Sequence, residues 1–154
     1  STLSPRLPRL PDSPDSNPFK AYLPHQEQQR MSALSAFTTQ LVQFFEELCT
    51  SFPEERDIKM ATEAIRGAKK INPRLLLDLF REHVYKDGAQ AIYARDFYQV
   101  RLYAQKKVEH QFNDMTCALS LFDKHWESMG QTNQEIIWQY LKVLCLLCEK
   151  ALRD

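Results

Sequence analysis

Glycine is scarce in this chain of 154 residues, which contains only Gly67, Gly88 and Gly130. A phosphate-binding loop or a dinucleotide-binding fingerprint needs several closely spaced glycines, so the sequence contains neither. It also lacks the Gly-x-Ser-x-Gly segment that positions the nucleophile of many hydrolases. We therefore expect a protein that is not an enzyme, with no catalytic residues and no cofactor.

Long apolar runs and an excess of one charge are missing as well. The longest apolar run covers residues 143–148, whereas a membrane-spanning helix needs roughly 20 apolar residues. The 20 Lys and Arg residues balance the 20 Asp and Glu residues, which argues against a protein built mainly to neutralise phosphates. No apolar signal core precedes the first helix. These absences predict a cytoplasmic or nuclear protein that is neither secreted nor inserted in a membrane.

Cysteine and histidine do not complete a metal-binding motif. Cys145 and Cys148 have the Cys-x-x-Cys spacing of zinc ligands and of redox-active thiols. A zinc site would need two further ligands, but no second Cys-x-x-Cys and no His-x-x-x-His occurs. No histidine follows a glutamate by three residues, as it does in di-metal helical bundles. We expect both thiols to be buried in a helix and the chain to bind no metal.

Proline is concentrated near the start of the sequence, where six of the eight prolines lie at or before Pro24. Four of them recur at every third residue from Pro5 to Pro14, which is the period of polyproline II and places them along one edge. We expect residues 1–30 to form an extended proline-rich arm that docks onto a neighbouring subunit or another protein partner, the alternative being an unstructured tail. The candidate partner-binding residues are Pro8, Leu10, Pro11, Phe19, Tyr22 and Leu23.

Beyond the arm, apolar residues recur at intervals of three and four, the pattern of amphipathic helices. The spacing predicts helices over residues 34–52, from Pro53 to about residue 70, and from Pro73 through residue 84. The Asp87-Gly88 pair is expected to end the third of these helices. A short helix follows over residues 89–94, and Asp96 either breaks it or caps the next one.

The second half of the chain predicts two further helices. Apolar residues from Val108 to Trp126 alternate by four and three, which indicates one long helix ending at Gly130. Residues 132–135 match a capping box that opens a last helix over about residues 133–152, and this helix is apolar on most of its circumference. The predicted fold is all-α, a compact bundle of five or six helices over residues 31–154 with the last helix at its centre. The expected core includes Phe44, Leu48, Ile65, Leu79, Phe112, Phe122, Trp126, Ile137 and Leu144.

One stretch combines basic and aromatic residues in a way that suits nucleic acid. Cations hold phosphates while aromatic rings stack on bases. The possible nucleic-acid contacts are Arg95, Arg101, Lys106 and Lys107, which alternate with Tyr93, Phe97, Tyr98 and Tyr103. The competing interpretation is a solvated helix face with its aromatic rings turned inward, and the zero net charge favours it.

Several short motifs within residues 37–150 occur together in one known family. They are Phe52-Pro53-Glu54, Asn72-Pro73, Arg95-Asp96-Phe97, Trp126 and the run from Ile136 to Leu141. In these motifs the chain resembles a family of small, mostly uncharacterised helical proteins encoded by large DNA viruses of algae and protists. The resemblance implies a helical fold and the setting of a virus, and it implies no activity.

The function predicted from these patterns is that of a non-enzymatic structural or protein-interaction module. Its proline-rich arm would attach it to a larger assembly, and the resemblance implies that this assembly is a viral particle. The alternative is a nucleic-acid-associated factor that uses the basic and aromatic stretch between Arg95 and Lys107.

Overall fold

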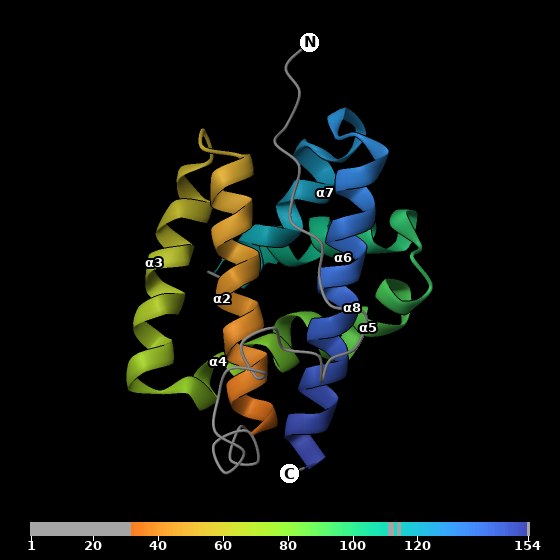
Figure 1. Cartoon of the computed structure of the whole chain (residues 1–154). Coiled ribbons are helices and arrows are strands. Elements are labelled where there is room, and N and C mark those ends of the chain that lie inside the picture. The colour runs from red at the N-terminus through yellow and green to blue at the C-terminus, as the bar shows by residue number, and fades with distance from the viewer. Residues whose placement is uncertain (1–31, 111–112, 114, 154) are drawn as a thin grey trace.

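The computed structural model describes residues 32–110, 113 and 115–153, and over these residues the fold is all-α with no strand. Six helices of eight or more residues form a bundle, as expected (Figure 1). They are α2 (Ala33–Ser51), α3 (Arg56–Ile71), α4 (Pro73–Phe80), α5 (Lys86–Tyr93), α6 (Phe97–His110) and α8 (Gln131–Arg153). Shorter helical turns are η2 (Arg81–Tyr85), η3 (Cys117–Ser120), α7 (Leu121–Lys124) and η4 (Trp126–Ser128). Within the same ranges, no helix combines the length and apolarity needed to cross a bilayer.

Helix α8 lies in the middle of the bundle and runs antiparallel to α2 (Figure 1). Apolar residues cover most of its circumference, and Tyr140 and Leu144 are completely buried. The ring of Tyr140 packs on Phe44 of α2 with 4.9 Å between the ring centroids. The central position predicted for the last helix is therefore confirmed.

The first helix boundaries follow local chemistry. Ser32 caps α2, because its hydroxyl oxygen accepts a hydrogen bond of 3.0 Å from the Ser35 N–H. Pro73 is the first residue of α4, as predicted. The expectation that α3 starts at Pro53 is wrong: a turn precedes Glu55, the N-cap residue, and α3 begins at Arg56.

The prediction that Asp87-Gly88 ends a helix is also wrong. The chain continues through the π-helical turn η2 into α5, and Gly88 is buried within α5. The ring of Tyr103, on α6, passes so close that a Cβ at residue 88 would lie 3.2 Å from Tyr103 Cε1. The Tyr103 hydroxyl also donates a hydrogen bond of 2.7 Å to the His83 carbonyl of η2. Gly88 therefore allows two helices to approach, and it does not act as a helix terminator.

The single long helix expected from Val108 to Trp126 is wrong, since α6 ends at His110 and three short helical turns follow. Asn113 stabilises the break, because its Oδ1 accepts hydrogen bonds of 2.9 and 3.0 Å from the N–H groups of Met115 and Thr116. Such local side-chain bonds compete with helix formation. Apolar spacing alone did not reveal the break, because the segment after it buries Met115, Leu119, Phe122 and Trp126, which a continuous helix would also bury.

The capping box expected at residues 132–135 does not form. Helix α8 starts at Gln131, two residues before the predicted start, and the Gly130 carbonyl accepts a hydrogen bond of 3.1 Å from the Gln134 N–H. Glu135, the acidic member of the expected box, instead forms an ion pair with Arg95.

Most of the predicted core is confirmed, and its aromatic part gathers around Trp126. The Trp126 ring stacks on Phe122 at 4.7 Å and on Phe97 at 5.4 Å, and it meets Trp138 edge-on at 5.2 Å. Leu79 is only half-buried, and Phe112 lies outside the described residues. The buried members of the predicted core are Phe44, Leu48, Ile65, Phe122, Trp126, Ile137 and Leu144.

Candidate functional site

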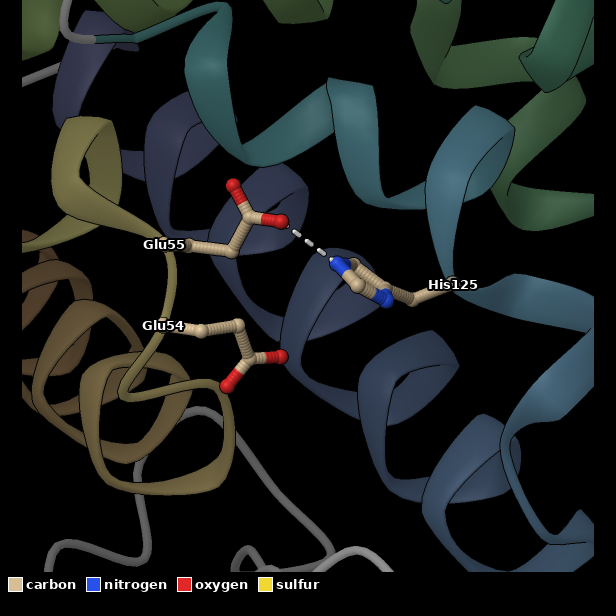
Figure 2. Close-up of side chains that lie close together, drawn as sticks. All are labelled: Glu54, Glu55 and His125. Carbon is tan, nitrogen blue, oxygen red and sulfur yellow. Dashed lines mark hydrogen bonds and ion pairs between the residues drawn. The ribbon is translucent and has the colours of Figure 1, made fainter.

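Three side chains with metal-binding and proton-exchanging groups meet at one end of the bundle, as Figure 2 shows. Glu54 and Glu55 lie in the turn between α2 and α3, and His125 directly follows α7. His125 Nε2 is 2.6 Å from Glu55 Oε1, although the two residues are 70 positions apart in the chain. One ligand atom from each of the three residues lies within 4.8 Å of the other two.

Local packing holds His125 in this position. Its ring stacks on Phe52, the C-cap residue that follows α2, with 4.8 Å between the ring centroids. Its backbone N–H donates a hydrogen bond of 2.9 Å to the carbonyl of Leu121, the first residue of α7. The imidazole therefore reaches Glu55 from a fixed backbone.

The surroundings of Glu55 favour its charged form. The hydrogen bond from His125 is the main cause that lowers the pKa of Glu55, and partial burial opposes it. Lys124 lowers that pKa further, since its Nζ is 3.6 Å from Glu55 Oε2. Glu54 is exposed, so solvent screens its charge.

One imidazole and two carboxylates are a ligand set that Zn²⁺ accepts. In this cluster, however, the donor atoms of Glu55 and His125 already bond to each other, and Lys124 places a positive charge beside the same carboxylate. A divalent cation would have to replace that hydrogen bond and tolerate the ammonium group. The geometry therefore fits a structural contact, which ties the turn between α2 and α3 to the end of α7.

Sequence patterns did not identify this cluster. Glu54 is part of the Phe52-Pro53-Glu54 motif, but no metal-binding or catalytic motif includes Glu55 or His125. Metal and catalytic motifs are recognised by short spacings along one helix or loop. No such spacing exists between residues 55 and 125, so only the folded structure brings them together.

The proposed nucleic-acid residues do not form one free basic surface. Arg95 pairs with Glu135, and Arg101 lies 3.4 Å from Asp123 and 3.7 Å from Glu127. Lys107 lies 5.8 Å from the centre of the Tyr103 ring, while Lys106 is exposed. Neighbouring carboxylates thus compensate the two arginines that would contact phosphate.

Cys145 and Cys148 lie within α8, and both thiols are free and fully buried. Burial raises the pKa of Cys148 to about 12 and raises the pKa of Cys145 even further. The reactive thiolate form is therefore strongly disfavoured. On the same helix, the Glu149 carboxylate accepts hydrogen bonds of 2.8 Å from Tyr85 and 2.9 Å from Tyr93, which join α8 to η2 and α5.

The partner-binding residues proposed on the arm lie outside the described residues, so their contacts remain a prediction. These residues are Pro8, Leu10, Pro11, Phe19, Tyr22 and Leu23.

A surface that the sequence analysis did not single out lies on α3, which forms an outer edge of the described bundle beside α2 (Figure 1). Ile71 is 87% exposed and Met60 is 68% exposed, although both side chains are large and apolar. Ala64 and Gly67 lie between them on the same side of the helix, at spacings of four, three and four residues. We call these four residues the α3 outer face.

Comparisons with models of known protein families, with curated proteins and with solved structures find no match to this chain.

Proposed function

We propose that this chain is a non-enzymatic structural or protein-interaction module that joins other protein chains in a larger assembly. The observation that carries the proposal is the α3 outer face, where Met60 and Ile71 are far more exposed than large apolar residues usually are. Uncovered apolar surface rimmed by polar residues is typical of a protein-binding site. Glu63 and Lys70 are exposed and supply such a rim.

The proline-rich arm, residues 1–30, is proposed as a second point of attachment. Its prolines restrict the backbone in advance, so less conformational entropy is lost when it docks. The resemblance to the viral family suggests a viral particle as the assembly. The four free thiols favour a reducing compartment, so we place the protein in the cytoplasm or nucleus of the infected cell.

The nucleic-acid alternative has weaker support. Arg95 and Arg101 are the cations with the best geometry for phosphate, and both are engaged with carboxylates of the same chain. Binding to nucleic acid would have to break these ion pairs. It would also show a steep loss of affinity with added salt.

Two measurements test the proposal. Multi-angle light scattering of the full chain, with and without an excess of purified candidate partner, should show complexes larger than one chain. Ile71→Glu or removal of residues 1–30 should reduce them, whereas Glu127→Gln, in the turn η4 and outside the α3 outer face, should not. If all variants assemble like the wild type, or if the chain instead binds generic duplex with a strong salt dependence, the proposal is wrong.

A further inference from the structure

The α3 outer face has a pattern that is complementary to itself. Met60, Ala64, Gly67 and Ile71 follow the spacing of a coiled-coil seam, with large residues at the ends and small residues in the middle. If a second α3 runs antiparallel to the first, Met60 faces Ile71 of the other copy, and Ala64 faces Gly67. Isologous two-fold contacts require a patch of this kind, which matches its own rotated image.

Among the described residues, nothing that packs against Gly67 explains why this position is a glycine. A Cβ added at this position would meet no atom within 4 Å, so packing inside the bundle does not require a glycine. A glycine in the interior of a helix makes that helix less stable than an alanine would, because glycine loses more backbone freedom on folding. At the centre of a helix pair, however, the missing side chain allows the two backbones to approach closely.

The charges beside the α3 outer face favour the antiparallel arrangement. Glu63 and Lys70 each precede a residue of the face by one position, so both lie along the same edge of it. Neither has an ion-pair partner in the described part of the chain. In an antiparallel pair, Glu63 of each copy lies beside Lys70 of the other. In a parallel pair in register, this edge of one copy and the same edge of the other lie on opposite sides of the contact, so Glu63 would not meet Lys70.

We propose that the partner of the α3 outer face is a second copy of this chain, with the two α3 helices antiparallel about a two-fold axis between Ala64 and Gly67. This inference rests on the proposed function and names the partner. A contact made by one helix face is at the small end of specific interfaces, so the dimer should dissociate on dilution in about the micromolar range.

The test is sedimentation equilibrium of the full chain and of two charge-reversal variants, Glu63→Lys and Lys70→Glu. Each variant alone places like charges together at both ends of the contact, so we expect the dimer to weaken at least about tenfold. An equimolar mixture of the two variants restores opposite charges at both positions and should associate about as tightly as the wild type. Tyr98→Glu, on the exposed side of α6, is the matched control and should have no effect.

The outcomes separate the inference from the proposed function. Restored association in the mixture, with native circular dichroism for all variants, would support the antiparallel dimer. If the wild type remains monomeric at millimolar concentration, or if the mixture stays dissociated, the antiparallel dimer is wrong. The proposed function is also wrong if, in addition, Met60→Glu and Ile71→Glu leave every protein complex of the chain unchanged.

Discussion

The ring of Tyr103 rests on Gly88, with Tyr103 Cε1 only 3.2 Å from the place where a Cβ of residue 88 would be. The Tyr103 side chain is also held at its hydroxyl, which donates a hydrogen bond to the His83 carbonyl. The ring therefore cannot move away easily, and the contact between α5 and α6 depends on the absence of a side chain at this position.

The two helix-interior glycines should respond in opposite ways to the same substitution. Gly88→Ala should lower the free energy of unfolding by about 1 kcal/mol, because overpacking against Tyr103 outweighs the gain in helix propensity. Gly67→Ala places its methyl group in open space and should raise that free energy by about 0.5–1 kcal/mol. Urea denaturation at low protein concentration, where the chain is monomeric, measures both values. A stabilising Gly88→Ala would show that Tyr103 is not fixed.

The contact between Glu55 and His125 should make the free energy of unfolding depend on pH in the acidic range. The pKa of Glu55 is lower in the folded chain than in the unfolded chain, where it is about 4.3. The charged Glu55 side chain therefore contributes fully to stability above that value, and the contribution is lost as the pH falls through the lower pKa of the folded chain. We expect the wild type to lose more stability between about pH 5 and pH 3 than Glu55→Gln does. Urea denaturation at each pH measures the difference.

Glu54→Gln is the control for that experiment, because it removes a charge from the same turn without removing the hydrogen bond to His125. Its stability should follow the wild-type curve over this pH range. If Glu55→Gln and Glu54→Gln behave alike, the hydrogen bond to His125 does not contribute measurably to stability.

Truncation of Trp126 should be among the most damaging single changes. Its ring contacts Phe97, Phe122 and Trp138, and Trp126→Ala should destabilise the fold by about 3–5 kcal/mol. Tyr98→Ala, at a residue 66% exposed on α6, should change stability by less than about 0.5 kcal/mol. Thermal unfolding followed by near-ultraviolet circular dichroism distinguishes the two, and equal effects would contradict the described core.

The four cysteines should differ in their reaction with iodoacetamide. Cys49 is partly exposed and should be alkylated first, whereas Cys145 and Cys148 are buried with raised pKa values and should react only after unfolding. Mass spectrometry of peptides from native and urea-treated protein measures the order. Rapid labelling of Cys145 and Cys148 in the native chain would show that these thiols are accessible, which would favour a metal or redox role.

The parts of the fold that depend on local sequence were predictable. Apolar spacing revealed α2 and α8, and Pro73 marked the start of α4. Asp96 was expected either to break one helix or to cap the next, and it caps α6, since its Oδ1 accepts a hydrogen bond of 3.2 Å from the Gln99 N–H. In each case the stabilising groups lie within a few positions of one another in the chain. Helix starts and amphipathic faces are properties of such short segments.

The features that were predicted wrongly or missed depend on residues that are distant in the sequence or on how the helices pack. Gly88 resembled a helix terminator because the residue that explains it, Tyr103, comes from another helix. The break at Asn113 was hidden because Met115, Leu119, Phe122 and Trp126 are buried after it, as they would be in a continuous helix. The contact between Glu55 and His125 could not be predicted because the fold alone determines which distant residues meet.

The antiparallel packing of α2 against α8 also has a consequence for biosynthesis. Because α8 is translated after every other described helix, the apolar face of α2, including Phe44, has no native partner while the ribosome synthesises the intervening chain. At about 5–20 residues per second, this interval lasts several seconds or more. Nascent chains that stop before α8 should therefore bind chaperones or aggregate, and codon changes that slow translation between α2 and α8 should lower the yield of folded protein.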